Sequence, residues 1–394
     1  MKICFILGST VFSGGTYVIF EHAIRINRRG NKDVFMVMQN RLKPEDLFWH
    51  PEARELQWMT FEEAKEIEFD AVIATWWGTC YDAYRLKSKA YLYFTQSIES
   101  KFYPPQNKFE RNYADSTYFF GFNVITEATW IKNYLKGNYN LDAEVVLNGI
   151  RKDFYKSDGP VFSQREKSKL RVLVEGPLGV FFKNVENTIK ICKQSKADEV
   201  WLLTSTETKN YPGVDRLISK VPIFKTAEVY RSCDVLVKLS YVEGMFGPPL
   251  EMFHCGGTAI VYDVTGHDEY IRHGYNSLVV KTNDEKKVID LIDYLKANPH
   301  ELERLKLGAK ETAEKWNDWD FSSKKFEEAV EISIQKKKIN QKQLIAITNH
   351  FKKWREVLRR EITFEYLIKV LFKFVIKGLL NNWKRNLFHN KHVR

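Results

Sequence analysis

Two carboxylates flank a glycine-containing turn in the stretch 240–257. Glu243 and Glu251 are separated by seven residues, among them Gly244 and Gly247. An ionised glutamate only accepts hydrogen bonds, whereas the vicinal diol of a sugar or a ribose donates two, so this pair suits a ligand that carries hydroxyls. The structural alternative is that Glu251 complements a helix dipole and Glu243 lies on a solvated loop.

The flanking sequence predicts a βαβ unit around this turn. Residues 233–239 are mostly Val and Leu, which is typical of a buried parallel strand, and Pro248-Pro249 suits a first helical turn. Gly256-Gly257 ends the helix before a second apolar run at 258–262. The turn is therefore expected at the carboxyl end of a strand and at a helix N-terminus, where free N–H groups bind anions. Hydroxyl acceptors around an anion site suggest a nucleotide sugar.

The whole stretch resembles the E-x7-E signature of retaining glycosyltransferases of family 4, of the type that builds bacterial polysaccharides. The resemblance covers residues 1 to about 335, and the other matching segments are Gly14-Gly15, Asn148-Gly149-Ile150, Cys255-Gly256, 264–271 and 273–280. It implies an α/β GT-B fold, in which two Rossmann-like, doubly wound domains face a cleft. It also implies a nucleotide-diphosphate sugar as donor, retention of the anomeric configuration, and no metal ion or other cofactor. The one Asp-x-Asp pair in the sequence, Asp318-Trp319-Asp320, lies outside the segments that carry the resemblance, so no such pair is expected to hold Mg²⁺ on the diphosphate.

The resemblance also assigns roles to individual residues. Glu243 and Lys183 are expected to be catalytic, and Glu251 to hold the ribose diol. The other expected donor-binding residues are Gly14, Gly15, Gly176, Gly244, Met245, Phe246 and Gly247. Taken alone, Lys183 has the character of a solvated surface lysine, and a pair such as Gly14-Gly15 commonly serves only a turn.

Two positions depart from the family pattern. The acid that usually follows Gly149-Ile150 is Arg151 here, which is a small departure, and the larger one is at residue 177. The family has an arginine after the glycine at 176, where this chain has Pro177, so a bidentate phosphate contact is lost. Backbone N–H groups at 178–180, Arg231 or Lys238 are candidate substitutes. Otherwise the chain binds a nucleotide sugar weakly or is a non-catalytic relative.

Aromatic and polar residues follow two predicted strands of the first half. Trp76 and Trp77 come after the strand at 70–75, and Gln96 and Glu99 come after the strand at 90–94. Aromatic faces stack on sugar rings and the polar groups could bind hydroxyls, so we expect an acceptor site here. The alternative is that both tryptophans are packing aromatics with a polar edge.

Length and apolar patterning predict two domains. The 394 residues suffice for two cores, and short apolar runs alternate with helical patterns, as in doubly wound sheets. The expected division is 1–150 for the acceptor domain, 151–169 for a linker, 170–320 for the nucleotide-sugar domain, 321–338 for a cross-over helix and 339–394 for a basic tail. Further strands are expected at 2–7, 33–37, 123–126, 144–147, 170–175 and 200–204. Five scattered cysteines without C-x-x-C spacing indicate a reducing compartment.

The tail carries nearly all of the net charge of +11. Residues 342–394 contain thirteen lysines and arginines against three acids. Glu365, Lys369, Lys373 and Lys377 recur every four positions and form one polar stripe on an otherwise apolar helix, 364–381. These charges argue against a membrane-spanning segment and favour a helix that lies on an anionic membrane surface. The alternative is packing against a partner protein or a second copy of the chain, as in a homo-oligomer. Nucleic acid is not expected as a partner.

These observations together predict a cytoplasmic enzyme, peripheral on the inner face of the membrane. It would transfer a hexosyl or deoxyhexosyl group to a saccharide, expected to be lipid-linked, in cell-surface polysaccharide synthesis. Two alternatives stay open: a GT-B sugar-nucleotide epimerase, and a non-catalytic saccharide-binding or scaffold protein.

Overall fold

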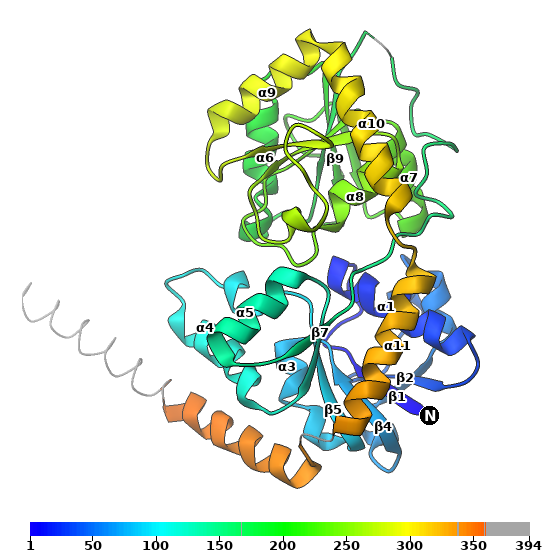
Figure 1. Cartoon of the computed structure of the whole chain (residues 1–394), viewed down its shortest axis with the longest axis vertical. Helices are drawn as coiled ribbons and strands as arrows, with labels where there is room; N and C mark the ends of the chain where they lie inside the picture. Colours follow the sequence, from blue (N-terminus) through cyan, green and yellow to red (C-terminus); the bar gives the residue numbers. More distant parts are fainter. Residues whose placement is uncertain (167, 337–338, 358, 360–394) are drawn as a thin grey trace, which may run out of the picture.

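The chain folds into two α/β domains that face each other (Figure 1). The structure is a computed structural model, and it describes residues 1–166, 168–336, 339–357 and 359. Each domain is built on one parallel sheet with helices packed against it. This architecture confirms the predicted fold of two Rossmann-like domains.

The first domain contains a seven-stranded sheet in the order β3-β2-β1-β4-β5-β6-β7. Its strands are β1 Lys2–Ile6, β2 Asp33–Met38, β3 Gln57–Thr60, β4 Glu68–Ala74, β5 Lys87–Thr95, β6 Asn123–Thr126 and β7 Ala143–Val145. Its helices are α1 Gly14–Arg28, α2 Phe61–Ala64, α3 Trp77–Cys80, α4 Lys108–Asp115 and α5 Thr129–Tyr139, and its short 3-10 turns include η2 Pro51–Glu55 and η4 Glu99–Phe102.

The second domain contains a six-stranded sheet in the order β10-β9-β8-β11-β12-β13. Its strands are β8 Arg171–Glu175, β9 Glu199–Thr204, β10 Arg216–Ser219, β11 Val235–Lys238, β12 Thr258–Tyr262 and β13 Ser277–Val280. Its helices are α6 Val185–Cys192, α7 Ile223–Arg231, α8 Gly247–His254, α9 Glu285–Ala297 and α10 Pro299–Lys315, with the 3-10 turn η6 Phe181–Lys183 before α6.

The central strands were predictable because helices cover both faces of each sheet. A strand such as β11 is buried at every residue and therefore reads as a continuous apolar run. The edge strands β3 and β10 are only half-buried and carry mixed residues, so apolar periodicity does not reveal them.

The helix that follows α10 crosses back to the first domain. Helix α11 (Trp319–Lys336) lies along the first domain in Figure 1, and its Phe326 ring stacks on His22 at 4.3 Å between centroids. The chain thus passes between the domains twice, and the two passages are joined by a bridge between Ile150 and Asp318.

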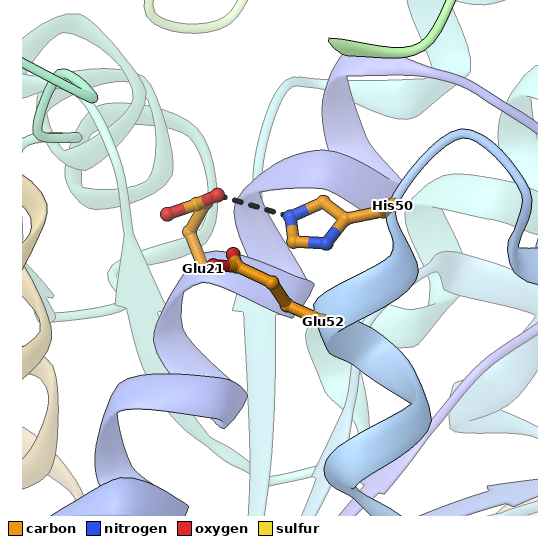
Figure 2. A group of neighbouring side chains, drawn as sticks. All are labelled: Glu21, His50 and Glu52. Atoms are coloured by element: carbon orange, nitrogen blue, oxygen red, sulfur yellow. Dashed lines mark hydrogen bonds and ion pairs between the residues drawn. The ribbon is translucent and has the colours of Figure 1, made fainter. Parts of the chain in front are cut away.

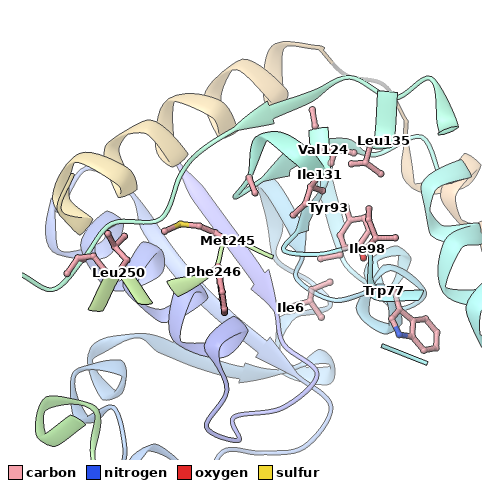
Figure 3. Close-up of a cluster of buried hydrophobic side chains, with 14 of the residues drawn as sticks. Ile6, Trp77, Tyr93, Ile98, Val124, Ile131, Leu135, Met245, Phe246 and Leu250 are labelled. Atoms are coloured by element: carbon pink, nitrogen blue, oxygen red, sulfur yellow. The ribbon is translucent and has the colours of Figure 1, made fainter. Parts of the chain in front are cut away.

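One apolar cluster extends through both domains. Met245 and Phe246 of the second domain belong to the same cluster as Ile6 and Val124 of the first domain, and Figure 3 shows all four. The two domains therefore share buried surface beyond their two chain connections.

A further helix at 341–357 packs on the outside of the first domain. Leu344 is fully buried there, and Phe351 and Trp354 pack against the core cluster of both domains. Lys352 lies 5.1 Å from the ring centre of Tyr84. The helix predicted at 364–381 lies outside the described residues. None of the described helices is long and apolar enough to cross a bilayer.

Candidate functional site

A cleft of about 930 Å³ lies between the carboxyl ends of the two sheets. The loops after β1, β4, β5 and β6 line one side, and the loops after β8, β9 and β11 line the other. This is the position at which parallel α/β sheets bind ligands. The N-termini of α1 and α8 both open onto it, at Gly14 and Gly247.

The cleft brings together most of the residues that the sequence singled out. Those that line it are Gly14, Gly15, Trp76, Gln96, Glu99, Lys183, Glu243, Gly244, Met245, Gly247 and Glu251. Three others do not: Trp77 and Phe246 are buried in the apolar cluster, and Gly176 lies between two lining residues, Glu175 and Pro177.

Glu243 and Lys183 form an ion pair inside the cleft. The Lys183 Nζ atom is 2.8 Å from Glu243 Oε2, and the Glu243 side chain is buried. Burial disfavours its negative charge, but the ammonium groups of Lys183 and Lys238 outweigh this effect and lower the pKa of Glu243. The second oxygen, Oε1, is buried without a hydrogen-bond partner in the described part of the chain. Glu243 is therefore an ionised acceptor with unused capacity.

Glu251 lies deeper in the cleft, near a second carboxylate. Burial, followed by the charge of Glu175, raises the pKa of Glu251 to about 7, and hydrogen bonds from Tyr230 and Tyr155 offset part of the shift. Glu175 is paired with Lys238, whose Nζ lies 2.6 Å from Glu175 Oε2. Glu251 thus has neutral hydroxyl donors as neighbours, and no cation is paired with it in the described residues.

The loop after β8 has the conformation that a glycine permits. Gly176 has a φ of +145°, and a Cβ there would lie 2.8 Å from a methyl group of Val185. Two N–H groups of this loop are already donated within the domain: Leu178 to Thr206 Oγ1 at 2.9 Å and Gly179 to Glu186 Oε1 at 2.5 Å. They are therefore poor replacements for the arginine that is missing at Pro177.

The two cationic substitutes considered from the sequence lie in different places. Arg231 donates to the carbonyl oxygens of Phe154 and Pro160 in the linker, at 2.7 and 2.8 Å, and does not line the cleft. Lys238 does line it, but as the partner of Glu175. A diphosphate in this cleft would therefore compete with glutamates for both lysines.

The turn at 243–245 rests against the first domain. A Cβ on Gly244 would lie 1.9 Å from the carbonyl oxygen of Gln96, so only glycine allows this approach. The N–H of Met245 donates to Glu127 Oε1 at 2.9 Å. Burial is the main reason why the pKa of Glu127 rises to about 7.

The proposed acceptor side contains one exposed tryptophan and one buried one. The indole of Trp76 is 42% exposed and lines the cleft, whereas Trp77 packs against Tyr81 and Tyr113 in the core. Glu99 is buried, and its Oε2 accepts the N–H of Trp77 at 2.6 Å. Burial raises the pKa of Glu99 to about 8, so it is largely protonated at neutral pH.

Gln96 lies against the start of α1. Its amide group is 3.4 Å from the position that a Cβ of Gly15 would take, so Gly15 leaves room for this side chain. The Oε1 atom of Gln96 is buried and has no partner among the described residues. Gln96 is therefore an available acceptor beside the helix N-terminus.

Two charged residues of the cleft were missed in the sequence, and the role of a third was only partly anticipated. Glu127 and Glu175 come immediately after β6 and at the end of β8, and Lys238 is the last residue of β11. Each lies where parallel strands present ligand-binding groups, and this position was the available signal. Lys238 was considered only as a substitute phosphate ligand.

A second charged cluster lies near the domain junction, around Glu21, His50 and Glu52 (Figure 2). Among the described residues, this group has ligand atoms close enough together for a metal ion, all within 4.8 Å. However, the guanidinium of Arg151 lies 3.3 Å from Glu21 and 2.7 Å from Glu52, and Arg25 pairs with Glu21 as well. We interpret the cluster as an ion-pair network, because a cation already lies between its carboxylates.

The comparisons with known proteins support this description. Residues 195–312 match the family model described as glycosyl transferases group 1. The structure is similar to sucrose-phosphate synthase from Thermosynechococcus elongatus, with a TM-score of 0.66, 14% identity, and coverage of 83% of this chain and 98% of that one. Anabaena HepE in complex with UDP-glucose gives a TM-score of 0.67 at 14% identity, with 84% and 100% covered.

A third similar structure is WaaG, a glycosyltransferase involved in lipopolysaccharide biosynthesis. Its TM-score is 0.64 at 12% identity, with 84% of this chain and 99% of that one covered. No curated protein sequence matches the chain. At such identities the structural likeness concerns the fold. The chain therefore has the GT-B fold of glycosyltransferases, and its second domain contains the segment that matches the glycosyl transferases group 1 family.

Proposed function

We propose that the protein is a retaining glycosyltransferase that moves a hexosyl or deoxyhexosyl group from a nucleotide-diphosphate donor to a saccharide. The observation that carries this proposal is the gathering of Glu243, Lys183 and Glu251 in one cleft, together with the N-termini of α1 and α8. In this proposal Glu251 accepts from the ribose diol. Glu243 accepts from the donor sugar, and the helix N-termini face the phosphates.

The reaction exchanges one bond at the anomeric carbon for another. The bond to the diphosphate oxygen breaks, and a bond to the acceptor hydroxyl oxygen forms while the hydroxyl proton is released. Negative charge grows on the leaving diphosphate, so the ammonium of Lys183 and the helix N-termini stabilise the transition state more than the ground state. For this to happen, Lys183 must turn from Glu243 towards the phosphate.

The similar structures support a UDP-sugar as the first donor to test. One of them binds UDP-glucose, and another acts in lipopolysaccharide biosynthesis. We therefore propose a lipid-linked saccharide acceptor and a role in making a cell-surface polysaccharide.

Calorimetric titration with UDP-, GDP-, dTDP- and CMP-sugars tests the donor proposal. We expect one class of nucleotide sugar to bind, and UDP-sugars are the first candidates. Glu251→Gln should weaken that binding, because a neutral amide is a poorer acceptor for a diol than a carboxylate. Product analysis with and without an acceptor then separates transfer from epimerisation. Absence of heat with all four classes would contradict the proposal.

A second candidate function is non-catalytic binding of a saccharide. It is favoured by Pro177 at the position of the expected arginine and by the pairing of both cleft lysines with glutamates. This candidate predicts that free saccharides bind while nucleotide sugars do not. The same calorimeter, loaded with oligosaccharides, distinguishes the two functions.

We also propose that residues 340–394 attach the protein to an anionic membrane surface, on the cytoplasmic face. Within the described part of this segment, Lys352 and Arg355 lie against Tyr84 and Tyr113 of the first domain. The attraction to lipid therefore has to come mainly from the residues beyond them. Flotation with anionic liposomes tests this: the full chain should float and a chain ending at 359 should not, whereas equal flotation of both would contradict it.

A further inference from the structure

The turn that carries Glu243 is held in place by side chains of the other domain. Ser97 Oγ donates to the carbonyl oxygen of Glu243 at 3.4 Å, and Trp130 Nε1 donates to that of Gly244 at 2.9 Å. The N–H of Met245 donates to Glu127 Oε1 at 2.9 Å. Three consecutive residues of the second domain thus each bind a different side chain of the first domain.

Glu127 is the member of this group with the most constrained surroundings. It is 5% exposed, and its second oxygen, Oε2, accepts from Asn148 Nδ2 at 2.9 Å. The charges that face it are those of Glu243, which raises its pKa, and Lys183, which lowers it. Both oxygens accept from protein groups, so the side chain acts on the turn rather than on a ligand.

We propose that Glu127 is a positioning residue that fixes the turn at 243–245, and with it the Glu243 carboxylate, when the two domains are closed. The inference that this serves catalysis rests on the proposed function; the holding of the turn does not. Met245 and Phe246 anchor one end of the turn in the apolar cluster, and Thr265 Oγ1 of the same domain also donates to the carbonyl of Glu243. Gly244 has no side chain to pack, so the course of the backbone from Glu243 to Met245 depends on these hydrogen bonds. Removing Glu127 would leave the Met245 N–H without its acceptor and allow Glu243 to move away from the cleft.

Hydrogen exchange of the amides at 241–247 tests the proposal on the full chain without any ligand. In Glu127→Ala we expect the Met245 amide to exchange at least about ten-fold faster, because its buried acceptor is gone. In Glu127→Gln we expect protection close to that of the wild type. The carbonyl of the new side chain still accepts from Met245, and the unpartnered Oδ1 of Asn148 can turn to accept from its amide.

The matched control is Glu269→Ala. Glu269 also bridges the domains, by accepting from Thr129 Oγ1 at 3.1 Å at the start of α5, but it does not touch the turn. We expect the exchange at 241–247 to stay within about two-fold of the wild type in this variant. If the amides at 241–247 exchange equally fast in Glu269→Ala and in Glu127→Ala, the effect comes from general opening of the domains and the proposal is overturned. Wild-type protection in Glu127→Ala would overturn it too.

Kinetics with the donor identified by calorimetry give a second readout. A positioning role predicts that Glu127→Ala lowers kcat at least about ten-fold while the donor KM changes little, and that Glu127→Gln restores kcat. If Glu127→Gln is as slow as Glu127→Ala, the charge of the carboxylate takes part directly and the positioning role is wrong. If no donor binds at all, the proposed function fails, and the exchange experiment still decides whether Glu127 holds the turn.

Discussion

Two charged clusters among the described residues, one at the domain junction and one in the cleft, differ in how their carboxylates are compensated. In the cluster at the domain junction, Glu21, Glu52, Asp153 and Asp320 each pair with Arg151 or Arg25. The cleft contains five glutamates and two lysines, and each lysine is already paired. Among the described residues, the other three glutamates have no cationic partner: Glu99, Glu127 and Glu251.

This difference separates a structural cluster from a functional one. A buried carboxylate that is matched by a guanidinium gains little from a ligand, and its main requirement is that the pair stays intact. A carboxylate that is buried without a cation has a raised pKa, as at many binding sites. We therefore interpret the junction as structural, whereas in the cleft Oε1 of Glu243 has no partner among the described residues and can accept from a hydroxyl group.

The strongest test of the comparison is to remove the cation of the junction. Arg151→Met should destabilise the protein by about 3–5 kcal/mol, because the fully buried Glu21 and the partly buried Glu52 lose a shared partner. Chemical denaturation measures the change. Affinity for UDP, measured while the variant is still folded, should remain within about three-fold of the wild type, since Arg151 does not line the cleft.

The matched control is Arg28→Met in the same region. Arg28 is 43% exposed and pairs with the half-exposed Glu55 and, at 3.5 Å, with Glu52, so the loss should stay below about 1 kcal/mol. Similar losses in the two variants would mean that the junction is no more than a solvated ion cluster, and the comparison would fail.

The next test removes the cation of the cleft. Lys183→Ala should weaken UDP binding roughly 10- to 100-fold, because charge-assisted hydrogen bonds to phosphate are worth about 1.5–3 kcal/mol. Lys190→Ala, on the exposed face of α6, should leave UDP affinity unchanged. Calorimetry checks both variants. Unchanged affinity in Lys183→Ala would indicate that the lysine serves only as the structural partner of Glu243.

The comparison also marks the limit of what the sequence could provide. The E-x7-E stretch placed Glu243 and Glu251 correctly on either side of the strand-to-helix turn, because strand, turn and helix are encoded locally. The ion pair between Lys183 and Glu243 joins residues from two different loops, and the contact of Glu127 with Met245 joins two domains. Such pairings depend on tertiary structure, which no local pattern encodes.

The dependence on tertiary structure also explains why the sequence revealed neither the burial of Trp77 nor the ion pairs of Arg151. Adjacent tryptophans look alike in a sequence, but the start of α3 turns Trp77 into the core and leaves Trp76 at the cleft. Arg151 stands where the family pattern has an acid, and only the structure reveals that it compensates Glu21 and Glu52.

A smaller effect concerns the dependence of stability on pH. The pKa of Glu251 is raised in the folded state to about 7, whereas an unfolded glutamate titrates near its model value of 4.5. Between these values the native state binds a proton that the unfolded state does not, so this group makes the free energy of unfolding fall as pH rises from about 4.5 to 7. The destabilisation that comes from burying the charge of Glu251 is therefore absent below about pH 4.5 and complete above about pH 7.

Glu251→Gln should remove this contribution. We expect the variant to gain roughly 3 kcal/mol at pH 8 relative to the wild type and to differ little from it at pH 4, with denaturation curves measured at both values. Glu62→Gln, at an exposed site, is the control and should leave the pH profile unchanged. Equal stability of Glu251→Gln and wild type at pH 8 would mean that the glutamate is not strained by burial.

The smallest effect is expected on the acceptor side, at Trp76. Its indole lies over the backbone at Gly8 and Gly78, where an added Cβ would come within 2.9 and 2.4 Å of it, so the ring is held flat at the edge of the cleft. If a sugar stacks on this face, Trp76→Ala should raise the acceptor KM about ten-fold in transfer assays with a panel of methyl glycosides, and leave UDP affinity unchanged. Trp77→Ala should instead lower the melting temperature, because that ring fills the core. An unchanged acceptor KM in Trp76→Ala would remove the aromatic platform from the proposed acceptor site and leave polar groups such as Gln96 to recognise the sugar.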